Sequence, residues 1–446
     1  MSASHRPLRV AVVGGGPSGL FTADALTCNE HSDVTVDILE RLPVPFGLLR
    51  YGVAPDHPNI KSAADTLQEV LDRSSVNLLC NVEIGRTVDV DDLRRHYDAL
   101  VYATGADADN TLAIPGEDLA GSHSATSFVK WYNGHPEAGA FDLAHTRRVA
   151  VVGAGNVALD VTRILVKDPG QLAETDIPHD TLNALAASAV TDVHILARRG
   201  AECAKFTTKE LRELGELSNV DVIVDADQIP PDPDDGWPPV VKRNMKVLRD
   251  WAGRETTSAP RRIYFHFSTR PTDIVGTDTV EAVRVEHTVA GSAGDGRHDI
   301  PVELVLRAVG YRSRPIAGIP FTQVTSTIPH ENHRVIRDGR AQRGEYAVGW
   351  AKRGPTGILG TNRADAEDTA AALFADRERL LAARPDDRNG IADLLRERSI
   401  RVLDKRGWTE IKSRELEHGA RHGRSRVKIR SWNDLVEAAN PVPSYH

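Results

Sequence analysis

Cysteine is scarce in this chain of 446 residues. Only Cys28, Cys80 and Cys203 occur, and no two of them form a CxxC motif. This spacing argues against a disulfide scaffold, a redox-active dithiol, or an iron–sulfur cluster held by neighbouring cysteines. A reducing, intracellular setting fits this cysteine usage best. No motif with metal-ligand spacing stands out, so the sequence predicts no metal site.

Long apolar runs and an excess of positive charge are also missing. No run approaches the ~18 apolar residues that cross a bilayer, and the segment before Leu8 is too short for a signal or transit peptide. With 55 Lys and Arg against 63 Asp and Glu, the net charge is −8, which disfavours a general nucleic-acid binder. We expect a cytoplasmic protein of two or three domains, without membrane insertion or a nucleic-acid partner.

The chain opens with the pattern of a strand, a glycine turn and a helix, LRVAVVGGGPSGLFTADAL. Gly14, Gly16 and Gly19 form a GxGxxG motif. Their small size permits the tight turn, a close approach of a pyrophosphate to the backbone, and close packing of helix on strand. The helix N-terminus then offers N–H groups and a partial positive charge to phosphates. We predict a dinucleotide-binding turn.

An acid ends the second strand of this unit, VTVDILE. Glu40 lies 21 residues after Gly19. A carboxylate at this position accepts hydrogen bonds from both ribose hydroxyls of an adenosine and repels a 2′-phosphate. The first unit therefore suits FAD or NAD.

The same pattern returns at RVAVVGAGNVALDVTRIL, where Gly153, Gly155 and Ala158 form the GxGxxA variant. The openings RVAVVGGG and RVAVVGAG are nearly identical, which indicates an internal duplication of a nucleotide-binding unit.

The second strand of this second unit, VHILARR, ends differently from that of the first. Ala197 replaces the acid, and Arg198 and Arg199 follow it. A guanidinium matches a phosphate in bidentate geometry. The second unit is therefore predicted to bind NADPH in preference to NADH.

These elements predict an α/β protein with two Rossmann-like three-layer domains, the second inserted into the first. We expect a discontinuous FAD-binding domain at 1–108 and 328–446, and an NADP-binding domain at 109–327. Residues 263–267 and 280–289 alternate like antiparallel strands. The charge-rich residues beyond Arg377 are expected to form surface helices and a tail.

Four longer stretches carry a resemblance to a known family: ERLPVPFGLLRYGVAPDHP, GNVALDVTRIL, ARRG followed by TTKELREL, and GWAKRGPTGIL. They closely resemble adrenodoxin reductase and its bacterial ferredoxin–NADP reductase relatives, from about Leu8 to the helix after Asn362. The resemblance implies transfer of hydride from NADPH to bound FAD, and then of single electrons to a ferredoxin. Bound flavin suits this task because it accepts a hydride and releases electrons singly.

The resemblance also implies site residues. The FAD contacts map onto Ser18, Glu40, Leu48, Ile84, Trp350, Gly357, Ile358 and Leu359. The NADP contacts map onto Ala154, Gly155, Asn156, Val157, Arg198, Arg199, Glu210 and Gly357. His57 and Glu213 map near the nicotinamide–flavin junction, with Asp160 close to them; we interpret these three as positioning and electrostatic groups, since hydride transfer needs no acid–base residue.

Two departures from the family pattern stand out. Ser18 occupies a position where the relatives usually carry Ala, and GAECAKF after Arg199 replaces the usual GPLQAAF. We expect Ser18 to have little effect, and Glu202 to weaken the affinity for the adenosine phosphate.

Basic residues gather in two expected helices and predict the partner. The proposed dock for an acidic ferredoxin comprises Arg212, Lys242, Arg243 and Lys246, with Lys205, Lys209 and Arg249 nearby. A further basic run, from Arg421 to Arg430, is interpreted as a surface tail or an interface strand. The chain is expected to be a monomer or weak dimer.

Three alternatives stay open at this point. A disulfide reductase would need the dithiol that the sequence lacks. An electron-feeding subunit, such as the glutamate-synthase small subunit, usually carries cysteine clusters. A flavin-bound NADPH redox sensor would bind both nucleotides without appreciable diaphorase activity.

Overall fold

The computed structural model describes residues 6–28, 33–232, 236–289, 292–382 and 390–439. The chain divides into two compact units. The first comprises residues 1–53, 57–108 and 311–446, and the second comprises 54–56 and 109–310. Apart from residues 54–56, the chain passes from the first unit to the second between Ala108 and Asp109. It passes back to the first unit between Gly310 and Tyr311, whereas the sequence analysis placed this boundary at 327/328. The boundary lies earlier because the chain leaves the second unit directly after its last strand, and the proline-containing loop that follows belongs to the first unit.

The first unit is built on a seven-stranded sheet with the order β16-β17-β18-β4-β1-β2-β3. Its strands are β1 (Leu8–Val13), β2 (Val34–Glu40), β3 (Val76–Cys80), β4 (Ala99–Tyr102), β16 (His330–Glu331), β17 (Arg334–Arg337) and β18 (Arg340–Ala347). Strands β18, β4, β1, β2 and β3 run parallel, and β16 to β18 form an antiparallel edge. A near-continuous apolar strand such as β1 is typical of a parallel sheet covered on both faces.

Helices cover both faces of this sheet. Its helices are α1 (Pro17–Thr27), α2 (Gly47–Tyr51), α3 (Pro58–Lys61), α4 (Ala63–Asp72), α5 (Val90–His96), α12 (Trp350–Arg353), α13 (Leu359–Ala375), α14 (Arg377–Ala382), α15 (Ile391–Glu397), α16 (Lys405–Arg421) and α17 (Trp432–Ala438). Val10 and Val12 pack on one face with α1, α4 and α13, whereas Ala11 and Val13 pack on the other with α5. The unit is therefore three-layered, as expected.

The second unit contains a six-stranded parallel sheet with the order β6-β14-β7-β8-β10-β9. Its strands are β6 (Ser122–Ser124), β7 (Arg148–Val152), β8 (Asp192–Leu196), β9 (Val220–Val224), β10 (Arg261–His266) and β14 (Leu304–Arg307). One face packs against helices, which include α6 (Ala125–Tyr132), α7 (Asn156–Val166), α8 (Pro169–Leu172), α9 (His179–Ala186), α10 (Thr208–Gly215) and α11 (Pro239–Ala252). The two predicted Rossmann-like units are thus confirmed.

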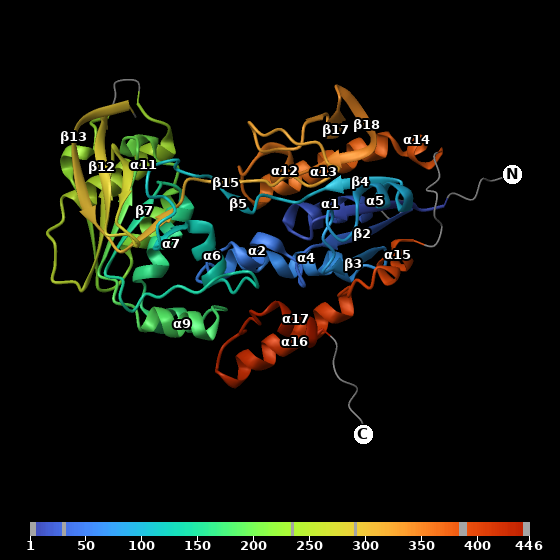
Figure 1. The fold of residues 1–446 in the computed structure, drawn as a ribbon, viewed down its shortest axis with the longest axis horizontal. Helices are drawn as coiled ribbons and strands as arrows, with labels where there is room; N and C mark the ends of the chain where they lie inside the picture. Colours follow the sequence, from blue (N-terminus) through green and yellow to red (C-terminus); the bar gives the residue numbers. More distant parts are fainter. Residues whose placement is uncertain (1–5, 29–32, 233–235, 290–291, 383–389, 440–446) are drawn as a thin grey trace. The chain divides into compact units, whose positions relative to one another are not determined.

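An antiparallel sheet of three strands covers the other face of the second unit. It consists of β11 (Thr269–Val275), β12 (Ala282–Val289) and β13 (Ser292–Pro301), of which β12 and β13 are labelled in Figure 1. The antiparallel prediction was right for residues 280–289 and wrong for residues 263–267. Strand β10 pairs in parallel with β8 and β9. Its alternation arises because Ile263 and Phe265 enter the helical core, while the half-buried Tyr264 and His266 face the smaller sheet.

The C-terminal helices of the first unit lie at the surface as expected, but each buries one face. Trp408 and Ile411 of α16 are buried in the main core. The fully buried Glu415 carboxylate accepts hydrogen bonds from both terminal nitrogens of the buried Arg50 guanidinium, one of them at 3.1 Å. Within the basic run, the Lys428 ammonium is also buried and donates to the backbone oxygen of Arg50 at 3.1 Å. Within this charge-rich region, Glu415 and Lys428 are therefore buried ions with partners.

Strands β5 (Ala108–Asp109) and β15 (Tyr311–Arg312) form a separate two-stranded sheet. Among the residues that the structure describes, no helix combines the length and apolarity that a membrane crossing needs.

Candidate nucleotide-binding site

The glycine turn of the first unit is shaped by contacts that leave no room for side chains. Gly14 has φ +114°, and a Cβ there would lie 2.4 Å from the backbone oxygen of Ala103. A Cβ on Gly19 would lie 2.0 Å from the backbone oxygen of Gly14. A Cβ on Gly16, in contrast, would meet only the Cα of Gly47, at 4.0 Å. The turn is thus closed against its own sheet and open above Gly16, on the side where a pyrophosphate would approach.

Helix α1 begins at this opening without a competing cap. Gly16 is its N-cap residue, Pro17 follows at the first helical position, and no side chain caps the helix. The first turn carries no acidic residue. The backbone N–H groups at the helix start therefore remain available to an anion, as phosphate binding at a helix N-terminus requires.

Glu40 lies at the predicted position and is buried. Its two carboxylate oxygens accept hydrogen bonds from the backbone N–H groups of Gly15 at 2.7 Å and of Leu42 at 2.8 Å. Burial raises the pKa of this carboxyl above its ordinary value, and the two N–H groups oppose that rise. Each oxygen keeps a further lone pair for a ribose hydroxyl.

A left-handed turn completes this region, and the sequence analysis missed it. Phe46 has φ +81° and Gly47 has φ +47°, and the backbone N–H of Phe46 donates to the backbone oxygen of Gly15 at 2.8 Å. A Cβ on Gly47 would lie 3.1 Å from the Cα of Gly16. The only sequence signal was the proline- and glycine-rich stretch PVPFG. Of the expected flavin contacts, Leu48 follows in α2, and Ile84 is buried in the core on the far face of the sheet.

The last group of expected flavin contacts surrounds the start of α13. Gly349 has φ +68°, its N–H donates to the Asp365 carboxylate at 2.6 Å, and a Cβ there would lie 2.1 Å from Oγ of Ser18. Trp350 follows, and its indole N–H donates to the backbone oxygen of Thr356 at 3.1 Å. Thus Ser18 and Trp350 are brought to neighbouring positions, because α1 packs along α13.

Gly357, Ile358 and Leu359 form the glycine loop and the first turn of α13. Gly357 has φ +88°, and Leu359 packs against the main core. Ile358 is 76 % exposed, which is unusual for a large apolar side chain in the described part of this protein. An apolar group that binds here would remove this side chain from water.

The second glycine turn repeats the geometry of the first. Gly153 has φ +137°, and a Cβ there would lie 2.3 Å from the backbone oxygen of Ala308. Gly155 is the N-cap residue of α7, and a Cβ there would meet nothing within 4 Å. Ala158 is fully buried, which explains why a small residue is needed third in the motif. This turn also has room for a pyrophosphate.

The loop before α10 lies directly against this turn. The Asn156 side-chain oxygen accepts a hydrogen bond from the backbone N–H of Thr207 at 2.8 Å. The backbone oxygen of Ala154 accepts one from the N–H of Lys205 at 2.8 Å. Ala154, Asn156 and Val157 are all partly exposed, as residues at a ligand-facing turn should be.

Arg198 and Arg199 follow β8 with exposed side chains. Their backbone oxygens accept hydrogen bonds from Thr288 Oγ1 at 2.6 Å and from the Ser268 N–H at 3.0 Å, so the backbone is held while the guanidinium groups stay in solvent. Within the described parts of the chain, neither guanidinium forms an ion pair. The two cations are therefore available to a phosphate.

A hollow of about 810 Å³ begins immediately after these arginines. Its lining includes Gly200, Glu202, Trp237 and His287, and it also contains the carboxylates of Asp225 and Asp227. The rings offer a stacking surface for a base. The Glu202 carboxylate folds back over Gly200; its effect on phosphate affinity stays a prediction.

A buried arginine organises the acidic residues predicted for the second unit. The Arg163 side chain is 2 % exposed and pairs with Asp160 at 2.8 Å, with Glu213 at 3.2 Å and with Glu210 at 3.4 Å. The fourth partner is Asp56, at 2.8 Å from Nε; Asp56 is also 2.8 Å from the Lys167 ammonium. Sequence reasoning missed Arg163, although the spacing Asp160 to Arg163 is that of helical neighbours.

Two carboxylates of this cluster, Asp160 and Asp56, have pKa values shifted in opposite directions. Burial raises the pKa of Asp160 to about 6, with Arg163 opposing the rise and the charges of Asp56 and Glu213 adding to it. Burial also acts to raise the pKa of Asp56, but its hydrogen bonds and charge contacts with Arg163 and Lys167 outweigh burial and lower it below the ordinary value. Of these two, Asp160 has the pKa nearer neutrality. His57, the third residue of the predicted group, belongs to the first unit, where it is buried at the start of α3; its grouping with Asp160 and Glu213 stays a prediction.

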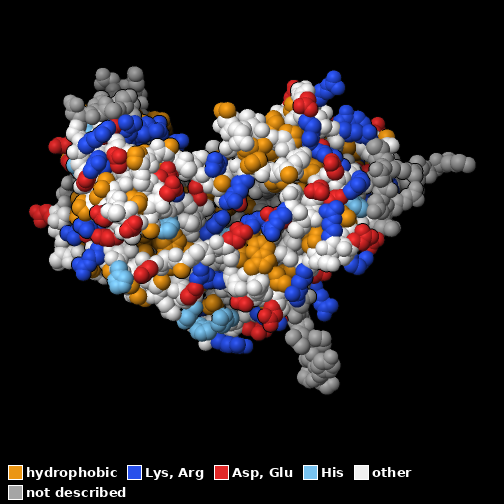
Figure 2. All heavy atoms as spheres, in the orientation of Figure 1, with side chains coloured by type: hydrophobic (Ala, Val, Ile, Leu, Met, Phe, Trp, Pro, Cys, Tyr) orange, Lys and Arg blue, Asp and Glu red, His pale blue; other side chains and the backbone are white. Residues whose placement is uncertain are grey.

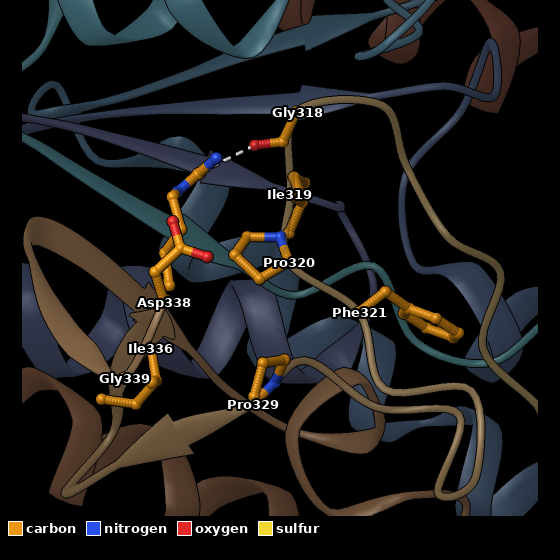
Figure 3. A pocket seen from close by; sticks show the side chains of 9 residues that line it. Gly318, Ile319, Pro320, Phe321, Pro329, Ile336, Asp338 and Gly339 are labelled. Carbon is orange, nitrogen blue, oxygen red and sulfur yellow. Dashed lines mark hydrogen bonds between the residues drawn. The ribbon is translucent and has the colours of Figure 1, made fainter.

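One further hollow of about 520 Å³ lies in the first unit and is shown in Figure 3. It is lined by the loop Gly318 to Phe321 and by the β17–β18 turn, and the Arg337 guanidinium donates to the Gly318 oxygen at 2.9 Å across it. None of the predicted site residues lines it, so it is separate from the nucleotide-binding turns.

Comparison with known proteins places this geometry in a family. Residues 8–226 match the family model described as pyridine nucleotide-disulphide oxidoreductase. The chain is 41 % identical to the NADPH-ferredoxin reductase FprA of Mycobacterium tuberculosis, over 97 % of this chain and 99 % of that protein. It is 35 % identical to the mitochondrial NADPH:adrenodoxin oxidoreductase of Arabidopsis thaliana, over 98 % of this chain and 96 % of that protein.

The structural comparison agrees. The solved structure of Mycobacterium tuberculosis FprA in complex with NADPH superposes with a TM-score of 0.92 at 40 % identity, and the match covers 97 % of this chain and 100 % of that one. The resemblance inferred from the sequence motifs is therefore confirmed: the chain belongs to the NADPH-ferredoxin reductase family that includes the mycobacterial FprA proteins and the adrenodoxin reductases.

Proposed function

We propose that this chain is an FAD-containing oxidoreductase that oxidises NADPH and reduces a ferredoxin-type iron–sulfur protein. The observation that carries the proposal is the contrast between the ends of β2 and β8. The first unit ends its strand in the buried carboxylate of Glu40, and the second continues past Ala197 into the exposed Arg198 and Arg199. One unit thus accepts a bare ribose, and the other accepts a phosphorylated ribose.

The first unit fits FAD. The space above Gly16, the uncapped start of α1 and the Glu40 carboxylate would hold the pyrophosphate and the adenosine ribose. Trp350 and the loop that begins at Gly357 would lie at the other end of the FAD site. Bound FAD would there remove the exposed Ile358 side chain from water. When bound, FAD supplies the exchange between a two-electron hydride donor and a one-electron acceptor.

The second unit fits NADPH. Gly155 and the start of α7 would hold the pyrophosphate, and Arg198 with Arg199 would hold the 2′-phosphate by charge-assisted hydrogen bonds. The hollow beyond Gly200 would take the adenine between its aromatic rings. We place His57, Asp160, Glu210 and Glu213 near the nicotinamide as electrostatic and positioning groups.

We propose helices α10 and α11 as the dock for the iron–sulfur protein. The two helices pack together where Gly215 meets Trp251. Arg212, Lys242, Arg243 and Lys246 are all exposed on them, and Arg249 is paired with Asp232 at 2.7 Å. Figure 2 shows acidic and basic side chains interspersed over the visible face of the molecule. The dock would therefore be a local basic patch rather than a whole face of positive charge.

The test uses the purified protein. We expect a yellow protein with a flavin absorption spectrum that reduces ferricyanide rapidly with NADPH and slowly with NADH. At saturating NADPH, reduction of an acidic ferredoxin should fall as salt rises, whereas reduction of a small neutral dye should change little. A yellow protein without turnover would support the redox-sensor alternative, and a chain that cannot be reconstituted with FAD would refute the proposal.

A further inference from the structure

Two histidines from neighbouring strands meet on one face of the six-stranded sheet. His194 lies in β8 and His266 in β10, and the two strands pair in parallel. Nδ1 of His194 and Nε2 of His266 are 3.0 Å apart. Both side chains are half-buried, on the face opposite to Ile195 and Phe265, which enter the helical core. The two histidines are 72 positions apart in the sequence, so their spacing did not predict that they pair.

The distance between these nitrogens suits a particular coordination geometry. A metal ion bound to imidazole lies about 2.0–2.1 Å from each nitrogen. Two nitrogens 3.0 Å apart then subtend an angle of about 94° at the metal, since sin(half-angle) is about 1.5/2.05. That is the right angle of tetragonal sites rather than the wider tetrahedral angle of structural zinc. Mixed nitrogen and oxygen ligands in tetragonal geometry favour Cu²⁺ or Ni²⁺, and Cu²⁺ binds most tightly of the first-row divalent ions.

The protonation state of the pair also favours a metal. Burial lowers the pKa of His266 to about 4, and the nearby imidazoles of His194 and His298 act in the same direction. Burial lowers the pKa of His194 as well, with Arg148 and Arg262 adding to this effect and Asp192 opposing it. Both rings are therefore neutral near pH 7, as metal ligation requires.

The surroundings hold the rings in place without adding net positive charge. The His194 ring stacks on Tyr264 with centroids 4.8 Å apart and an interplanar angle of 11°. The two neighbouring cations are paired, Arg148 with Glu303 at 2.7 Å and Arg262 with Asp192 at 2.8 Å. The two facing nitrogens share a hydrogen bond, so one of them carries a proton. A metal ion would bind once that ring's proton moves to its other nitrogen, which leaves two neutral, oriented ligands.

A third imidazole stands on the facing sheet. His298 lies in β13 opposite Val285 of β12, and Ile300, two residues further on the same side of β13, belongs to the buried cluster against the six-stranded sheet. The side chain of His298 is exposed, and its electrostatic influence reaches His266.

We propose that His194 and His266 form a binding site for a late divalent transition metal, with Cu²⁺ as the preferred ion and water in the remaining positions. The site lies inside β8 and β10 rather than at the glycine turn or beside Arg198 and Arg199. It is thus distinct from the nucleotide-binding residues. A bound ion would cross-link the two strands, and any ligand of the folded state stabilises that state.

The test titrates the full-length, tag-free, chelator-treated holoprotein with Cu²⁺ alone, followed by electron paramagnetic resonance and calorimetry. We expect a nitrogen-ligated, tetragonal Cu²⁺ signal at one equivalent. Changing His194→Asn together with His266→Asn should weaken binding at this site by at least about tenfold, a lower bound for the loss of metal ligands.

The matched control is a second histidine pair. His418 and His422 lie one helical turn apart at the exposed end of α16, with ring centroids 5.0 Å apart. Changing both to Asn should leave the proposed signal intact. Loss of the signal in this control, or its persistence in the His194/His266 variant, would overturn the proposal.

A second measurement needs no variant and so does not depend on whether the variant folds. Cu²⁺ should slow amide hydrogen exchange in peptides that contain β8 and β10 of the wild-type protein, and raise its unfolding temperature. Protection confined to α16, or absent from β8 and β10, would refute the site. Neither result bears on the NADPH-dependent reduction of the flavin, so this inference and the proposed function fail separately.

Discussion

Nε of Arg163 lies 2.8 Å from the Asp56 carboxylate, in a position where both side chains are almost completely buried. Asp160, Glu210 and Glu213 contact the same guanidinium. One cation thus contacts three acids that the family resemblance had singled out, and its removal would take away the buried charge that they share.

Arg163→Met should therefore destabilise the protein strongly. Removing one partner of a buried ion pair costs roughly 3–5 kcal/mol. The measurement is the free energy of unfolding from urea titration of the intact chain. Arg148→Met is the matched control, because Arg148 and Glu303 are 42 % and 33 % exposed and such a pair contributes about 1 kcal/mol or less. Equal losses in the two variants would contradict the assigned role of Arg163.

Asp160 gives the cluster a pH dependence. Its pKa is raised to about 6, chiefly by burial, whereas an unfolded aspartate titrates near about 3.9. Between these values the folded chain binds more protons than the unfolded chain, so this residue's contribution to stability is present at low pH and is lost as pH rises through about 6.

Asp160→Asn should remove that contribution. The unfolding free energy of the wild type, relative to the variant, should decline between about pH 4 and about pH 6 and stay level above about pH 7. The lowered pKa of Asp56 gives a slope of the opposite sign, but at lower pH, because its titration lies below the ordinary aspartate value of about 3.9. A difference that grows with pH would show that the pKa of Asp160 is lowered instead.

Gly349 is expected to be needed for flavin binding. Its φ of +68° and ψ of −145° lie in a sparsely populated region that costs another residue about 1–3 kcal/mol. Ala would in addition place its Cβ 2.1 Å from Oγ of Ser18, which would push α1 away from α12. Gly349→Ala should purify with little FAD, as judged from the ratio of flavin to protein absorbance.

Gly339→Ala separates backbone strain from this collision. Gly339 has a similar φ of +72°, and a Cβ there would meet nothing within 4 Å. It should keep its FAD, and Ser18→Gly should restore part of the FAD content of Gly349→Ala. If both alanine variants lost flavin equally, strain alone would explain the result.

The paired arginines are expected to set the nucleotide preference. Changing Arg198 and Arg199 to Gln should lower kcat/KM for NADPH about 100-fold, from roughly 1.5 kcal/mol for each charge-assisted bond. The value for NADH should change less than about threefold by the same reasoning, because NADH has no 2′-phosphate. Arg254→Gln, an exposed site at the end of α11, should change neither value. Equal losses for both nucleotides would refute the assignment.

The sequence was most informative where structure depends on local pattern. Gly14 and Gly153 adopt positive φ after a buried strand, and Glu40 and Arg198 stand where each unit's second strand ends, because these features depend on a few adjacent residues. The duplication made the two-unit α/β fold predictable.

Other features depend on residues far apart in the chain and were missed. Asp56 and Arg163 are 107 residues apart, and neither alone indicates burial. The parallel pairing of β10 was hidden because a strand buried unequally on its two faces alternates like an antiparallel one. The charge of α16 concealed Glu415, since a charged residue suggests the surface unless its partner is known.

The position of β18 and the burial of Glu415 have a consequence for synthesis on the ribosome. Strand β18 lies between β17 and β4, so the first sheet stays incomplete until residues beyond Ala347 have emerged, and Arg50 has no carboxylate partner until Glu415 follows. The inserted unit is complete once Gly310 has been made. The unit that begins first is therefore the one that finishes folding last, and its early strands must wait, exposed to chaperones, while the later unit forms.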